Sequence, residues 1–184
     1  NFSLLTVFGT LLLIATLLIK NKKIYPYFYG LSFTMLNYEI FNTLNLNIFD
    51  FFINYLFPIS LVSGVFSSMM IGHWFLVDPT ISKEGMKKIA ITSTFQSLIL
   101  TPLVFFEFIG QDIESIFKNV ILILFLSTSI LSFASYKSLG EKSYTGVMAS
   151  TGLSYLSLIV SLGASGGLLL LSLIHISEPT RRLS

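Results

Sequence analysis

The sequence contains no cysteine, and only 11% of its residues are charged. The absence of cysteine excludes disulfides, thiol nucleophiles and cysteine-ligated metal sites. Soluble domains usually carry about 25% charged residues, so a chain with 53% hydrophobic residues and this few charges could not hide its apolar surface from water. The sequence therefore predicts that a lipid bilayer is its main contact partner. The formal net charge of +2 is too small to indicate nucleic acid binding.

Motifs of several large enzyme classes are also missing. The sequence has no G-x-x-x-x-G-K-[ST] phosphate-binding loop, no H-E-x-x-H zinc helix and no G-x-S-x-G nucleophile elbow. No inverted repeat relates the first three apolar segments to the last three, so this frequent signature of secondary transporters is absent. We therefore assign no catalytic residue and no metal site, and we lean against an enzyme.

Long apolar segments dominate what is present. A transmembrane helix needs about 20 mainly apolar residues. Six segments meet this requirement, at roughly residues 2–19, 25–42, 51–77, 88–110, 116–136 and 144–170. We predict an all-α, polytopic integral membrane helix bundle of about six transmembrane helices, in a single domain over residues 1–170. Pro58 is expected to kink the long third helix.

The lysines are distributed unevenly among the connecting segments. Eight lysines lie in or beside the connections that follow the first, third and fifth segments: Lys20, Lys22, Lys23, Lys83, Lys87, Lys88, Lys137 and Lys142. The opposite side has only Lys118, at the start of the fifth segment. Cytoplasmic loops carry an excess of lysine and arginine. The pattern predicts a multi-pass protein of the cell membrane, specifically a bacterial inner membrane, with lysine-rich loops in the cytoplasm and the N-terminus of this chain outside.

Small residues recur along two of the segments. Gly64, Ser68 and Gly72 stand at four-residue spacing in the third segment, and Gly163 and Gly167 form a G-x-x-x-G in the sixth. Such stripes allow helix backbones to approach closely in lipid. We expect these faces to contact other helices, with the lining of a polar path as the alternative. Further hydroxyl stripes lie in the fourth and sixth segments: Ser93, Ser97 and Thr101, and Ser150, Ser154, Ser157 and Ser161.

Few ionisable side chains interrupt the apolar segments, and each costs about 2.5–3.5 kcal/mol at mid-membrane on insertion scales. Glu39 and Glu107 fall near the outer ends of the second and fourth segments. If they face each other, one would hold a proton, because two close carboxylates resist joint ionisation. Gln96 lies eleven residues before Glu107, on nearly the same helix face. These three residues are candidates for a proton or ion path; the alternative is that both carboxylates are simply hydrated among lipid headgroups.

A second group of candidates lies at the end of the third segment. His73 could be an axial haem ligand or a proton carrier, although a lone histidine cannot build a multi-histidine metal site. The alternative for His73 and Trp74 is an interfacial pair in which tryptophan anchors at headgroup depth. Asp78 is either part of this group or a turn residue, because Pro79 disfavours helix at the position before it.

Two stretches resemble known sequences. The run GHWFLVDPT, Gly72–Thr80, resembles a Gly-His-Trp signature of small uncharacterised bacterial membrane proteins, a resemblance that implies no particular activity. The run LSLIHISEPTR, residues 171–181, resembles the translation of a transposase adapter used in preparing sequencing libraries. We therefore interpret residues 171–184 as a non-native tail, keep them out of functional arguments, and expect a chain truncated at both ends.

Three functional hypotheses follow from these residues. The first is a transport or permease-like protein that moves a proton, an ion or a small solute past polar residues of the second to fourth helices. The second is a non-catalytic membrane module for assembly or sensing. The third is a haem-linked membrane protein that uses His73.

Overall fold

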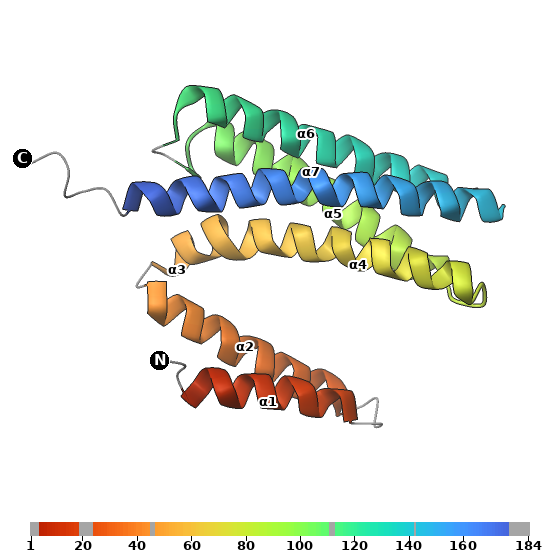
Figure 1. Ribbon diagram of the computed structural model, residues 1–184, viewed down its shortest axis with the longest axis horizontal. Coiled ribbons are helices and arrows are strands. Elements are labelled where there is room, and N and C mark those ends of the chain that lie inside the picture. Colours follow the sequence, from red (N-terminus) through yellow and green to blue (C-terminus); the bar gives the residue numbers. More distant parts are fainter. Residues whose placement is uncertain (1–3, 19–23, 45–46, 111–112, 142, 177–184) are drawn as a thin grey trace, which may run out of the picture. The chain divides into compact units, whose positions relative to one another are not determined.

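The structure is a computed structural model that describes residues 4–18, 24–44, 47–110, 113–141 and 143–176. In these ranges the chain is helical apart from its turns and contains no strand, so the prediction of an all-α fold is confirmed. The elements, shown in Figure 1, are α1 (Leu4–Leu18), α2 (Tyr25–Leu44), α3 (Ile48–Asp50), the π-helical segment η1 (Phe51–Leu56), α4 (Phe57–Val77), α5 (Lys83–Phe105), α6 (Ser115–Ser138) and α7 (Tyr144–Ile176).

Four helical segments of the described chain are long and apolar enough to cross a membrane. They are Ile48–Val77, Glu84–Phe105, Ser115–Ser138 and Tyr144–Leu170. The apolar stretch of α1 is shorter, and α2 has sufficient length but is interrupted by tyrosine, asparagine, threonine and glutamate. Six spans therefore remain a prediction, because α1 and α2 do not meet the same test of length and hydropathy.

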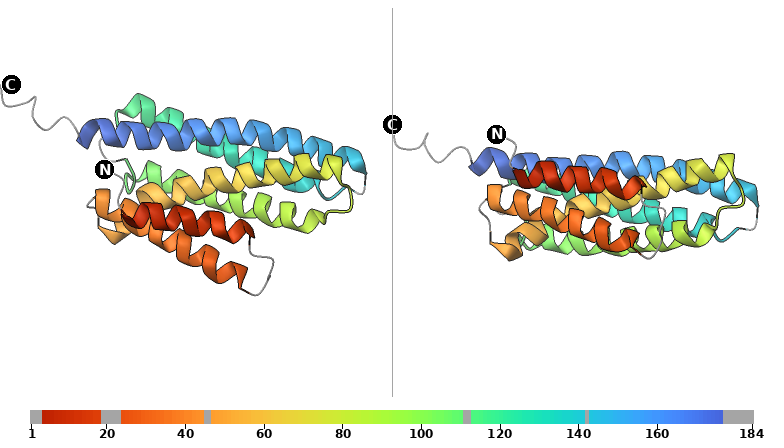
Figure 2. Two further views of the ribbon diagram at one scale, coloured as in Figure 1. Left: turned by 60° about the horizontal axis from the view of Figure 1, so that its bottom comes forward. Right: turned by 90° about the horizontal axis from the view of Figure 1, so that it is seen from below.

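The chain divides into two compact units, Asn1–Phe51 and Phe52–Ser184. Within the first unit α1 packs against α2, and the buried Ser32 hydroxyl donates a hydrogen bond to the carbonyl oxygen of Gly9 over 2.7 Å. Within the second unit α4, α5, α6 and α7 run alongside one another in both views of Figure 2. The single domain expected over residues 1–170 stays a prediction beside this division.

The ends of α5 differ from the expected residues 88–110. The helix begins five residues earlier, because the Ser82 hydroxyl accepts a hydrogen bond from the backbone N–H of Glu84 and caps the first turn. It ends at Phe105, in the turn that follows Pro102. Glu107 consequently lies in a turn beyond the helix. Pro58 does not kink the middle of a helix: it lies in the first turn of α4, just after η1, a stretch in which the helix widens to the π form.

Two loops meet at the lysine-rich end of the four-helix unit. The Lys83 ammonium group donates hydrogen bonds to the carbonyl oxygens of Glu141 and Ser143, over 3.3 and 3.4 Å. The same ammonium lies 5.7 Å from the centre of the Phe75 ring. The loop between α4 and α5 and the loop between α6 and α7 therefore lie at the same end of this unit.

The four-helix unit has a polar zone in the middle of its interior and large apolar side chains on its outside. Large apolar side chains face outward, among them Ile130 and Ile159, which are 68% and 67% exposed. A middle zone of buried serine and threonine side chains, which we call the hydroxyl layer, comprises Ser68, Ser93, Thr94, Ser97, Thr128, Ser129, Ser132, Ser135, Ser150, Thr151, Ser154, Ser157 and Ser161. A bundle stabilised by water would show the opposite arrangement.

Apolar clusters close the hydroxyl layer at both ends. The larger cluster packs toward the loop between α5 and α6 and consists of Leu61, Val65, Leu100, Val104, Ile109, Ile113, Ile121, Phe125, Ala164 and Leu168. The smaller one packs toward the lysine-rich loops and consists of Phe75, Met86, Leu139 and Val147. Along each of the four helices, the hydroxyl-bearing residues of the layer stand between these two clusters in the sequence.

Gly72 permits a close approach between α4 and two neighbouring helices. A Cβ atom built at this position would overlap the Thr151 hydroxyl of α7 and lie 2.9 Å from the Met86 Cε of α5. At Gly152, by contrast, a Cβ atom would meet nothing within 4 Å. The packing role that the sequence assigns to the small residues thus has a specific contact at Gly72.

We expect Gly72→Ala to lower the free energy of unfolding by about 1–3 kcal/mol, because the added methyl group overpacks the α4–α7 contact. The measurement is reversible unfolding of the full chain in mixed detergent micelles. Gly152→Ala is the matched control and should leave stability unchanged or raise it by up to about 1 kcal/mol. Equal effects of the two substitutions would contradict the close approach at Gly72.

Candidate functional site

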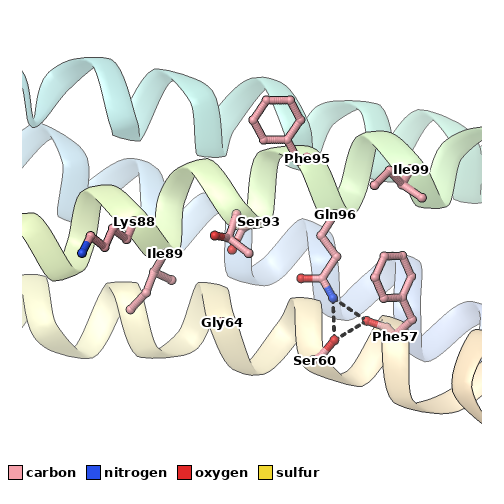
Figure 3. Close-up of a pocket in the computed structure, with 10 residues that line it drawn as sticks. Phe57, Ser60, Gly64, Lys88, Ile89, Ser93, Phe95, Gln96 and Ile99 are labelled. Atoms are coloured by element: carbon pink, nitrogen blue, oxygen red, sulfur yellow. Dashed lines mark hydrogen bonds between the residues drawn. The ribbon is translucent and has the colours of Figure 1, made fainter.

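A groove of about 690 Å³ lies between α4 and α5 (Figure 3). Its lining mixes aromatic and aliphatic walls with hydroxyl and amide groups, and a lysine: Phe57, Ser60, Gly64, Lys88, Ile89, Thr92, Ser93, Phe95, Gln96 and Ile99. Its volume falls in the usual range for small-molecule sites, which are mainly apolar with a few convergent polar groups. No carboxylate belongs to this lining.

Gln96 is the central polar group of the groove. Its amide nitrogen donates hydrogen bonds to the carbonyl oxygen of Phe57, over 2.9 Å, and to the hydroxyl of Ser60. These acceptors determine which end of the amide faces α4. The amide oxygen points the other way along the groove in Figure 3 and is oriented to accept a hydrogen bond from a bound molecule.

Ser93 lies between the groove and the interior of the bundle. It is 2% exposed and lines both the groove and a small cavity of about 10 Å³ inside the four-helix unit. Gly64 faces it from α4, where an added Cβ atom would lie 3.3 Å from the Ser93 hydroxyl oxygen. The boundary between groove and interior is therefore formed at this point by one hydroxyl group and a residue without a side chain.

Hydrogen bonds between hydroxyl groups join α6 to α7 inside the hydroxyl layer. Ser132 pairs with Ser157 over 3.0 Å, and Ser135 pairs with Ser150 over 2.7 Å and with Ser154 over 3.3 Å. Helix α5 joins the network where the Ser129 hydroxyl of α6 donates to the carbonyl oxygen of Thr94, over 3.3 Å. Most of the buried hydroxyl groups thereby satisfy one another or a backbone carbonyl, as buried polar groups must.

The three residues proposed for a proton or ion path are not brought into one place within the second unit. Gln96 lines the groove, whereas Glu107 lies outside it, in the turn after α5. Glu107 pairs with Lys118 over 2.7 Å, so its charge is already compensated. Glu39 lies half-buried on α2, in the first unit. The proposed sharing of a proton between Glu39 and Glu107 stays a prediction.

Glu107 occupies an unusual backbone position. Its φ angle is 60°, in the left-handed region that favours glycine. The Glu107 N–H donates to Val104 and the Phe108 N–H donates to Leu103, which is the hydrogen-bond pattern of a Schellman motif at the end of a helix. The fold thus places a charged residue where helices usually end on glycine, and its carboxylate reaches Lys118 from there.

We expect Glu107→Gly to be more stable than Glu107→Ala by about 1 kcal/mol. Both substitutions remove the ion pair, but only glycine also removes the strain of the left-handed conformation. Chemical unfolding of the two variants under one detergent condition provides the comparison. An alanine variant as stable as the glycine variant would show that residue 107 does not adopt this conformation.

His73 and Trp74 are exposed on the outer surface of α4, Trp74 by 63%. Among the described residues, no three histidine, aspartate or glutamate side chains gather into a group that could hold a metal ion. Haem ligation or proton transfer by His73 stays a prediction, as does the interfacial anchoring of the pair. The exposed position of Trp74, close to the lysine-rich end of α4, is suited to anchoring.

Asp78 lies in the turn after α4. Its carboxylate accepts hydrogen bonds from the Thr80 hydroxyl over 2.6 Å and from the Thr80 backbone N–H over 3.0 Å. Both bonds favour the ionised form, the hydroxyl bond more strongly, and they hold the pKa of Asp78 below its usual value. This local pairing contributes stability above the ordinary aspartate pKa of about 3.9, and the contribution is lost as the pH falls through the lower folded-state pKa.

Thr80→Ala should therefore raise the pKa of Asp78 toward its ordinary value, because the hydroxyl bond is lost while the backbone bond remains. Thr80→Ser keeps a hydroxyl group and should leave the pKa low. The carboxyl carbon of Asp78 can be followed by NMR from about pH 2.5 to 6, a range around the ordinary aspartate pKa. An identical titration in both variants would exclude the hydroxyl group as the main cause.

Sequence reasoning missed the contribution of α6 to this interior. The hydroxyl stripes of α5 and α7 are evident from their spacing, but the buried groups Ser129, Ser132 and Ser135 were not recognised. Their spacing of three residues places them along one helix face and was the available signal. The helical period placed Gln96 and Glu107 on one helix face. In the structure α5 ends at Phe105, so Glu107 no longer shares a helix with Gln96.

Comparison of the chain with protein-family models, with curated proteins and with solved structures finds no match.

Proposed function

We propose that the chain is a multi-pass membrane protein of permease-like type that passes a small polar solute between its α4–α5 groove and its hydroxyl-lined interior. Four membrane-length helices with outward apolar side chains support the membrane location. In this proposal the lysine-rich loops face the cytoplasm of a bacterial cell, and the distribution of positive charge supports the cytoplasmic side. In this proposal α1 and α2 also cross the membrane, which completes six spans.

The observation that carries this proposal is the position of Ser93, which borders both the groove and the inner cavity. The apolar clusters at the two ends of the unit argue against an axial pore through the four helices. Entry from the side, past Ser93 and Gly64, is the route that the packing favours. Conformational opening would be needed for passage, as in other transport proteins with alternating access.

The chemistry of the route favours a neutral, hydrogen-bonding solute. Its polar groups are hydroxyls and one amide, with Lys88 in the groove lining and no carboxylate. A bare cation would lose its hydration without meeting a negative charge, which is unfavourable in a site of low dielectric constant. The proton or ion branch of the hypothesis instead depends on Glu39 and Glu107, which lie outside the groove lining.

Flux measurements on the full chain in liposomes test the route. Ser93→Val and Gln96→Leu should each reduce the flux of small neutral probes such as urea and glycerol at least about tenfold, since loss of one required hydrogen bond at a constriction costs roughly 1.4 kcal/mol or more. Ser67→Val, an exposed serine of α4 outside the groove lining, is the matched control and should leave flux unchanged.

Glu39→Gln and Glu107→Gln separate the two branches of this hypothesis. Proton or cation flux that disappears in these variants, while urea and glycerol flux is absent, would replace the neutral-solute route with a carboxylate path. Flux of every probe that is insensitive to Ser93 and Gln96 would contradict the route through the groove.

The second candidate is a non-catalytic membrane module for assembly or sensing. The observation in its favour is the mutual pairing of buried hydroxyl groups such as Ser132 with Ser157 and Ser135 with Ser150, which stable helix packing alone would explain. A protein that shows no flux of any probe and co-purifies with a defined membrane complex would favour this candidate.

A further inference from the structure

Ser68 differs from the other members of the hydroxyl layer. It lies on α4, is 3% exposed, and its hydroxyl oxygen is buried without a hydrogen-bond partner among the described residues. A buried hydroxyl that pairs with nothing destabilises a fold, because the bonds it made in the unfolded state are not replaced. An unpaired, fully buried hydroxyl in a layer whose other hydroxyls are mostly paired calls for a partner that the described residues do not supply.

The cavity beside Ser68 has the size and chemistry of a hydration site. Its volume of about 10 Å³ corresponds to roughly one water-sized probe. All four helices contribute serines to its wall, which is completed by Val65 and Ala90: Ser68, Ser93, Ser132, Ser135, Ser154 and Ser157. A buried water typically makes about three hydrogen bonds to otherwise unsatisfied polar groups, and hydroxyl groups can either donate or accept.

We infer that one water molecule is bound in this cavity, where it pairs with the Ser68 hydroxyl and links α4 to the serines of the other three helices. A metal or other bare ion is disfavoured because no charged side chain lines the cavity. Ser93 also borders the groove, so the bound water can exchange through that boundary. The site does not depend on the proposed transport function, since a packing module with this interior would need the same water.

The first test compares Ser68→Ala with Ser67→Ala in the full chain. If water pairs with Ser68, removal of the Ser68 hydroxyl loses one buried hydrogen bond. The ratio of folded to unfolded protein should then fall about fivefold. Ser67 is the matched control, because it is the neighbouring serine of α4, is exposed, and bonds only to the Ser63 carbonyl of its own helix. Its substitution should change the equilibrium less than twofold.

A Ser68→Ala variant that is as stable as the starting protein, or more stable, would overturn the inference, because removal of an unpaired hydroxyl from a dry cavity carries no loss of a bond. Water-edited solid-state NMR in lipid bilayers gives a second, independent readout. The side-chain protons of Ser68 and Ser154 should receive magnetisation from water in the starting protein. The side-chain protons of Ser154 should lose it in Ser68→Val, whose methyl groups occupy the cavity. Absence of water transfer to these serines in the starting protein would also overturn the inference.

Discussion

The close packing of helices, α6 on α7 through paired serines and α4 on α7 at Gly72, is the constraint on which the rest of the second unit depends. Serine side chains are short, so their hydroxyl groups can bond to hydroxyls or carbonyls of the next helix only when the two backbones are near. Glycine, which has no side chain, allows the backbones to come that near. Gly72 shows how little space is left, since even a methyl group there would overlap Thr151. In lipid, where burial of apolar surface gives little drive to join helices, such contacts and weak interhelical hydrogen bonds hold a bundle together.

This packing also determines where polar groups reach the outside of the unit. Apolar clusters close both ends of the hydroxyl layer, and the outward faces of the helices are covered with large apolar side chains. The α4–α5 groove is different because Gly64 provides no side chain and Ser93 provides only a hydroxyl. The same layer therefore supplies the hydrogen bonds that join helices and, at Ser93, a hydroxyl residue that borders the groove.

Ionisable residues have a smaller part in this interior than their rarity suggests. Glu107 is held beyond the end of α5 by a Schellman motif and is paired with Lys118. Asp78 is paired with Thr80 in a turn. Both carboxylates are satisfied locally, so the polar character of the bundle comes from neutral hydroxyl groups. A charge buried among these helices would have required a partner of opposite sign, whereas a serine needs only a nearby carbonyl or hydroxyl.

The all-helical class and the approximate location of each helix were determined by the sequence alone, because composition and hydropathy act locally along the chain. Helix ends were less predictable: α5 ends before Glu107 because of hydrogen bonds made in the turn after Pro102. Only the tertiary structure decided which serines share one cavity, that Gln96 reaches the Phe57 carbonyl of α4, and that Ser68 finds no hydrogen-bond partner among the described residues. Those features depend on how helices are rotated against each other, and the helical period of one segment carries no information about its neighbours.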